Sequence, residues 1–65
     1  MKTKAVHSES KSSWNVVGEE WGKKYKIARV PYYKANDEIL STINKNEALE
    51  HALFISKCFN ELYNK

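Results

Sequence analysis

The chain has 65 residues, of which 42% are hydrophobic and 29% are charged, and its formal net charge at neutral pH is +3. This length allows one small domain, and the composition excludes both a membrane-spanning protein and a chain too polar to fold. A single cysteine, which excludes an internal disulfide, and an N-terminus without a signal-peptide pattern predict a cytoplasmic protein with no membrane partner.

The first segment, residues 1–13, is rich in serine and lysine and has almost nothing to bury. Segments of this kind at a chain end are seldom held by packing. We therefore expect residues 1–13 to form a flexible N-terminal arm and residues 14–65 to form a single small domain.

Two β-strands are predicted after the arm. Residues 14–18 form a short aromatic and β-branched run, and residues 25–33 form a longer one. The apolar residues of the second run change face after Ile27, which indicates either a β-bulge near Ala28 or a strand with both faces partly covered. Pro31 has no backbone N–H, so this end of the strand is expected at a sheet edge.

The clearest pattern lies in residues 44–65. Ala48, Ala52, Ile55 and Phe59 recur every three or four residues, which is the spacing of one face of an α-helix. The preceding Asn44 is a candidate N-cap. This pattern predicts one C-terminal helix.

Between the two predicted strands and the helix, residues 38–43 are compatible with a third short strand that has Ile39, Ser41 and Ile43 on one side. The pattern leaves open whether this segment is a true strand. The predicted fold is α+β: a two- to three-stranded antiparallel meander packed against one C-terminal helix.

Catalytic, cofactor and metal motifs are missing from the sequence. Cys58 and His51 lie seven residues apart, about 10 Å along a helix, whereas a nucleophile and its base must be about 3 Å apart. The histidines and the cysteine lack the spacing of a zinc site, and no glycine-rich phosphate-binding motif is present. We predict a protein that is not an enzyme and uses no cofactor or metal.

Two groups of side chains are candidates for contact with a partner. Cations and rings interleave along residues 21–34, where an open sheet face would stack single-stranded bases and hold phosphates. Alternatively, the rings form the core and the lysines protect a sheet edge.

Leu53 and Phe54 fall outside the apolar stripe of the helix, either as isolated exposed residues or as a homodimer or partner contact. The candidate partner-binding residues are Trp21, Lys23, Lys24, Arg29, Tyr32, Tyr33, Leu53 and Phe54.

The order of the elements resembles that of small phage and prophage accessory proteins. The resemblance rests on a Trp-x-Val strand (Trp14 and Val16), a Tyr-x-Ile-Ala strand (residues 25–28) and a helix of the Asn-Ala-x-Leu-Ile-Ala type, matched here by residues 47–48, 52–55 and 59–62. It implies a small protein that binds and blocks a component of the host cell, including restriction or CRISPR machinery, in the host cytoplasm.

The leading hypothesis is therefore a non-enzymatic interaction protein that inhibits a host defence or another host process by docking on a protein or ribonucleoprotein complex. The alternative is a small RNA- or single-stranded-DNA-binding protein that uses the basic aromatic strand face. A nucleic-acid complex would weaken steeply with salt, whereas an interface built on Phe54 or Trp21 would tolerate salt.

Overall fold

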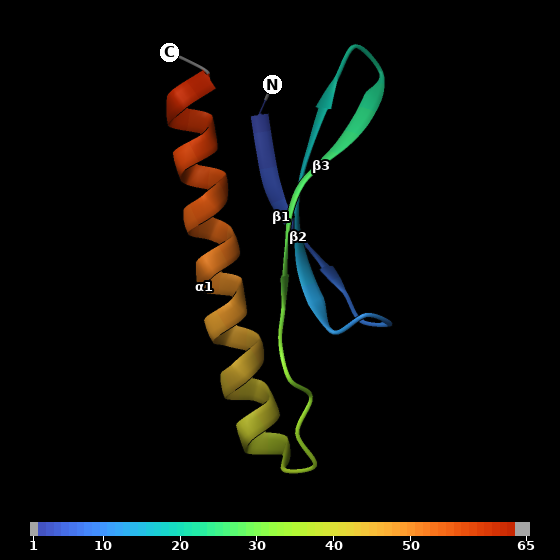
Figure 1. Cartoon of the computed structure of the whole chain (residues 1–65), viewed down its shortest axis with the longest axis vertical. Coiled ribbons are helices and arrows are strands. Elements are labelled where there is room, and N and C mark those ends of the chain that lie inside the picture. The colour runs from blue at the N-terminus through green and yellow to red at the C-terminus, as the bar shows by residue number, and fades with distance from the viewer. Residues whose placement is uncertain (1, 64–65) are drawn as a thin grey trace.

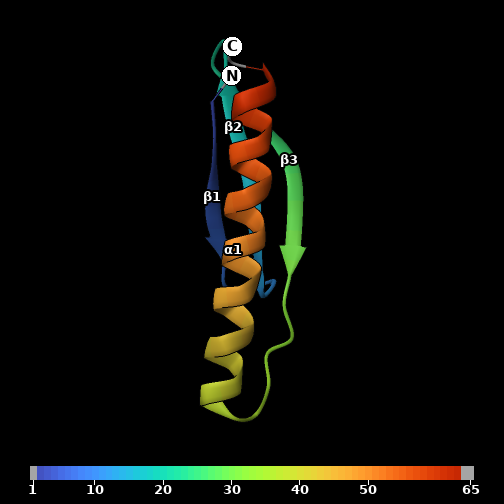
Figure 2. The same cartoon turned by 90° about the vertical axis from the view of Figure 1, so that its left-hand side faces the viewer.

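The computed structural model describes residues 2–63 as three strands followed by one helix (Figure 1). Strands β1 (Lys2–Ser8), β2 (Ser13–Glu20) and β3 (Lys23–Pro31) form an antiparallel sheet in the order β1-β2-β3. Helix α1 (Glu38–Tyr63) runs lengthwise across one face of this sheet, with β1 and β3 on either side of it (Figure 2). The predicted α+β class is confirmed. Within the described residues, no helix is long and apolar enough to cross a membrane.

The N-terminal segment is part of the sheet. Lys2–Ser8 pairs with β2 along its whole length, so the prediction of a flexible arm is wrong for these residues. The segment forms a strand although it is polar, because only one of its faces is covered. Thr3 is buried under the helix and Ala5 is half-buried, whereas the intervening Lys4 is exposed.

Strand β3 contains the predicted bulge. Val16 pairs with Ala28 and Val17 pairs with Lys26, so Ile27 is the extra residue on β3. The bulge explains the change of face in the sequence, because one inserted residue reverses the alternation of side chains. Strand β3 is an edge strand that ends at Pro31, where a missing N–H costs no ladder hydrogen bond.

The helix begins six residues earlier than the sequence pattern suggested. The Asp37 side-chain oxygen accepts hydrogen bonds from the backbone N–H groups of Ile39 (2.8 Å) and Leu40 (3.4 Å), so Asp37 is the N-cap. The predicted third strand at residues 38–43 is therefore wrong: this segment is the first part of α1, and β1 supplies the third strand. Asn44 does not cap the helix; its side-chain N–H donates to the carbonyl oxygen of Tyr33 (3.0 Å). Residues 64–65 of the predicted helix lie outside the described residues.

The contact between helix and sheet is made by small side chains. Val16 of β2 and Ala48 and Ala52 of α1 are the buried hydrophobic residues. Ile55 and Phe59, from the predicted stripe, are half-buried. Because alanine occupies the middle of this contact, the helix approaches the sheet closely but buries little apolar area.

A polar cluster joins β1 to the last turns of the helix. The hydroxyl of Thr3 hydrogen-bonds to the hydroxyl of Ser56 at 2.7 Å, and both groups are buried. The Asn60 side chain accepts a hydrogen bond from the Thr3 backbone N–H (2.7 Å) and donates one to the Thr3 carbonyl oxygen (3.2 Å). The outer edge of β1 is therefore hydrogen-bonded to the helix at this residue.

Candidate nucleic-acid interface

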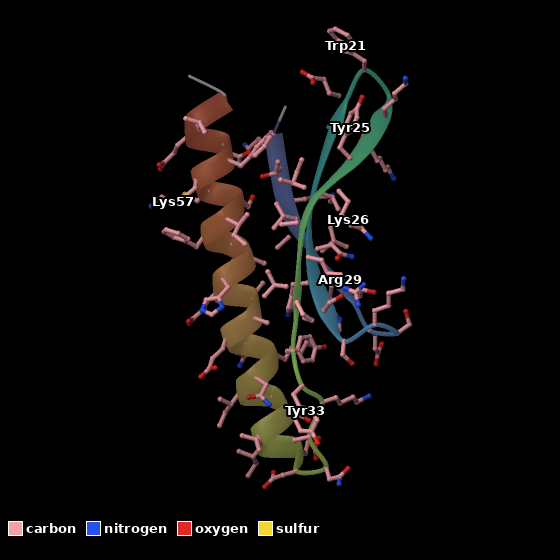
Figure 3. All side chains as sticks on the ribbon, viewed as in Figure 1. Trp21, Tyr25, Lys26, Arg29, Tyr33 and Lys57 are labelled. Carbon is pink, nitrogen blue, oxygen red and sulfur yellow. The ribbon has the colours of Figure 1, made fainter. Side chains whose placement is uncertain are left out.

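The sheet has one face under α1 and one face that no element of residues 2–63 covers. On the covered side, the Trp14 indole N–H donates to the Lys45 carbonyl oxygen of the helix (3.1 Å), and Val16 is fully buried. Asn15 and Val17 alternate with these residues and therefore lie on the opposite side. Figure 3 shows Lys26 and Arg29 of β3 also pointing away from the helix. We call this second side the uncovered face.

The uncovered face includes three rows of side chains that run across the strands, beside a fourth row formed by Ser8, Ser13 and Pro31. In each row the first residue comes from β1, the second from β2 and the third from β3. The three rows are Lys2, Glu19 and Lys24; Lys4, Val17 and Lys26; and Val6, Asn15 and Arg29. A depression of about 820 Å³ is lined by most of these residues.

The bulge determines which cations share this face. Lys24 and Lys26 precede Ile27, and Arg29 follows it. In a regular strand Arg29 would point to the opposite side from Lys26, because the two residues are three positions apart. The extra residue reverses the alternation and brings Arg29 onto the uncovered face.

Charge on the uncovered face is divided between the strands. The five cations (Lys2, Lys4, Lys24, Lys26 and Arg29) lie on the outer strands β1 and β3, and all are exposed. The middle strand contributes two uncharged side chains and the single carboxylate of these three rows, that of Glu19. The face is therefore strongly positive, with its positive charge in two parallel lines.

The predicted partner-binding residues do not form one surface. Lys24 and Arg29 lie on the uncovered face. Trp21 and Lys23 lie at the β2–β3 turn, and Tyr33 is 74% exposed in the connection to α1. Leu53 and Phe54 are exposed on the helix.

Tyr32 lies on the covered side of the sheet. Its hydroxyl and His7 Nε2 share a hydrogen bond of 2.6 Å, and the His7 ring lies 4.7 Å from that of Trp14. The rings and cations that interleave in the sequence are thus separated in space, because adjacent strand residues point to opposite sides.

Trp21 occupies an unusual position. It forms the β2–β3 turn with Gly22, and the two residues have φ angles of 53° and 76°. Turns with two positive φ values favour Asn-Gly or Gly-Gly, because a bulky side chain is strained there. Trp21 is also 95% exposed and so gains little from packing within the chain (Figure 3).

Sequence reasoning missed Lys2, Lys4 and Asn15 as binding candidates of the uncovered face, whereas Lys26 lies in the basic aromatic run of residues 21–34 that it indicated. Lys2 and Lys4 fall in the segment that the sequence predicts as an arm. The alternation of Lys2, Lys4 and Val6 with smaller side chains was the signal that indicated a strand with one basic side.

No group of three or more His, Cys, Asp or Glu residues in residues 2–63 is placed to hold a metal ion. Comparison with protein-family models, curated proteins and solved structures finds no match to this chain. What the uncovered face binds is therefore inferred from its own geometry.

Proposed function

We propose that this protein binds nucleic acid through the uncovered face of its sheet. The observation that supports the proposal is the collection of five exposed cations on one side of the molecule, around a depression and opposite the covering helix. Such a surface attracts the phosphate backbone, because each phosphate neutralised by a lysine or arginine releases condensed counterions.

The arrangement of the lysines favours binding over simple protection of the sheet edges. Edge protection needs charged residues along the free edge of a strand. Here the edge of β1 is hydrogen-bonded to Asn60 at Thr3, and the lysines of β1 and β3 share one face of the sheet. These lysines therefore form one positive surface, which attracts a polyanion.

The test is a titration of short fluorescent DNA, duplex and single-stranded, monitored by anisotropy over a range of salt concentrations. We expect binding in the range of about 1–100 μM at physiological salt, weakening steeply as salt rises. The double variant Lys4→Gln/Lys26→Gln should lower the salt slope for duplex by about two units.

The matched control is Lys57→Gln. Lys57 is exposed on α1 and points away from the sheet (Figure 3), so its loss should leave the salt slope unchanged. A loss for Lys57→Gln about half that of the double variant, in proportion to the charge removed, would show that net charge alone drives binding. Absence of binding to either DNA at low salt would contradict the proposed function.

A second candidate function is favoured by the exposed side chains of the helix. Phe54 and Leu53 are 67% and 51% exposed, and Ile39, Leu40 and Ile43 are exposed on the same helix. Together with the resemblance to phage and prophage proteins, this surface supports docking on a host protein or ribonucleoprotein as an inhibitor, or pairing with a second copy of the chain.

This second candidate is tested with Phe54→Glu. A protein partner that is captured from a bacterial lysate after nuclease treatment, and is lost with Phe54→Glu, would support the inhibitor function. Sedimentation of the purified protein distinguishes the homodimer, which would dissociate in the same variant. A monomer that retains no protein after nuclease treatment would contradict both forms of this candidate.

A further inference from the structure

We infer that the ligand of the uncovered face is B-form duplex DNA and that the sheet lies in the major groove, with Asn15 and Arg29 contacting base edges. This inference rests on the proposed function and specifies its ligand. It follows from the small number of rings on the face, the spacing of its charged strands and the chemistry of the row that contains Asn15 and Arg29.

The uncovered face is poorly suited to single strands. Proteins that bind single-stranded nucleic acid stack successive bases on several aromatic rings. None of the nine residues in the three rows is aromatic. Tyr25, which lines the depression, pairs with Gly18 in a row that contains Thr3, and the Thr3 hydroxyl contacts the helix. The single ring beside the depression is fewer than the several that a stacking platform needs.

The spacing of the charged strands suits a groove. Neighbouring strands lie about 4.8 Å apart, so β1 and β3 are separated by about 10 Å. The major groove of B-DNA is about 12 Å wide and has a phosphate backbone along each side. Two lines of long, flexible lysine side chains on the outer strands can reach the two backbones while the middle strand faces the bases. The major groove of A-form RNA is too narrow for this arrangement.

The third row, formed by Val6, Asn15 and Arg29, places two base-reading side chains together. Asn15 and Arg29 are direct cross-strand partners on the uncovered face. Asparagine makes paired hydrogen bonds with adenine, and arginine makes them with guanine, both at the major-groove edge. Val17, in the adjacent row, is an apolar contact for a thymine methyl group.

The side chain of Asn15 also has a hydrogen-bond acceptor without a partner. Its side-chain oxygen is buried and has no partner among the described residues. A buried acceptor without a donor is costly. The amino group of adenine would supply that donor once the neighbouring long side chains turn outward to phosphates. The Asn15 side-chain oxygen therefore lies in the row in which base contact is inferred.

The first experiment compares ligands of equal length: duplex DNA, single-stranded DNA and duplex RNA, each as a pool of random sequence. We expect duplex DNA to bind about tenfold or more tightly than the other two, and methylation of guanine N7, a major-groove atom, to interfere with binding. Equal affinity for all three, or insensitivity to N7 methylation, would overturn the groove inference while leaving nucleic-acid binding intact. Absence of binding to any pool would instead overturn the proposed function.

The second experiment selects preferred duplexes from the random pool with the intact chain, with Asn15→Ala and with Arg29→Lys. The intact chain should enrich a motif in which adenine and guanine are close together. Asn15→Ala should relax the adenine position and Arg29→Lys the guanine position, each by about tenfold, without a change in salt slope.

Lys57→Gln is the control variant and should enrich the same motif as the intact chain. Circular dichroism of each variant separates loss of contact from loss of folding. An unchanged motif in folded Asn15→Ala and Arg29→Lys would overturn the assignment of these two residues to base contact.

Discussion

The side-chain amide of Asn60 hydrogen-bonds to both backbone polar groups of Thr3, accepting from its N–H and donating to its carbonyl oxygen. In this position the amide takes the place of a peptide group from a neighbouring strand. The helix therefore covers one face of the sheet and also satisfies the outer edge of β1 at this residue. This reduces the exposed pairing groups that make an edge strand prone to aggregation.

Replacing Asn60 should measurably destabilise the fold. We expect Asn60→Ala to lower the free energy of unfolding by about 1–3 kcal/mol, because it leaves partly buried backbone groups of β1 without partners. Chemical denaturation monitored by circular dichroism provides the measurement. Asn60→Asp keeps an acceptor for the Thr3 N–H but places a carboxylate oxygen against the Thr3 carbonyl oxygen, so it should also be destabilised, and more at neutral than at acidic pH. An unaffected Asn60→Ala variant would show that water replaces the amide at no cost.

Replacing Trp21 should stabilise the chain. Asparagine tolerates the positive φ angle at this turn position better than a bulky residue does. Trp21→Asn should therefore raise the free energy of unfolding by about 1 kcal/mol, detectable as a higher melting temperature. Trp21→Ala is the comparison, since it removes the ring but keeps the backbone strain. If Trp21→Asn melted below the natural chain, the ring would have to pack within the fold.

Glu19 should oppose DNA binding. Its carboxylate lies between Lys2 and Lys24 in the first row of the uncovered face, where it repels phosphate. We expect Glu19→Gln to strengthen duplex binding about two- to fivefold at low salt, with the gain fading as salt is raised. Anisotropy titration measures the change, and Glu61→Gln on the helix is the matched control. Weaker binding by Glu19→Gln would indicate that the carboxylate positions the two lysines.

Deleting Ile27 should remove the bulge but preserve the uncovered face. Without Ile27, Lys26 and Arg29 are only two positions apart, so regular alternation keeps both on the same side of the sheet. We therefore expect the salt slope for duplex DNA to stay unchanged in a folded deletion variant. Ile27→Val is the control, because it keeps the residue count and therefore the bulge. A folded deletion variant whose slope falls would contradict the register assigned to β3.

Part of this architecture could be predicted from the sequence. The helix was recognisable because Ala48, Ala52 and Phe59 follow its period, and the bulge because the apolar residues of β3 change face at Ile27. The start of α1 was missed because a six-residue run fits both a strand and a helix, and the cap at Asp37 decides between them. Strand β1 was missed because its covered side uses Thr3 and Ala5, which pack on the helix without a strongly apolar pattern.

The candidate site was predictable only in part, for a related reason. Lys24 and Arg29 are prominent in the sequence, but their neighbours in space, Lys4 and Asn15, come from other strands and become neighbours only through the pairing register. Tyr32 was assigned to the same surface because it lies near these cations in the sequence. Its hydrogen bond with His7 places it on the opposite side of the sheet.

The link between Thr3 and Asn60 also affects how the chain folds during synthesis. The two residues are separated by 57 positions, so β1 gains its last partners only after almost the whole domain has left the ribosome. Contacts between distant residues slow folding, because a long loop must close before they form. The β2–β3 hairpin can form earlier from local contacts. A nascent chain arrested before residue 60 should therefore contain a hairpin but remain sensitive to protease at β1.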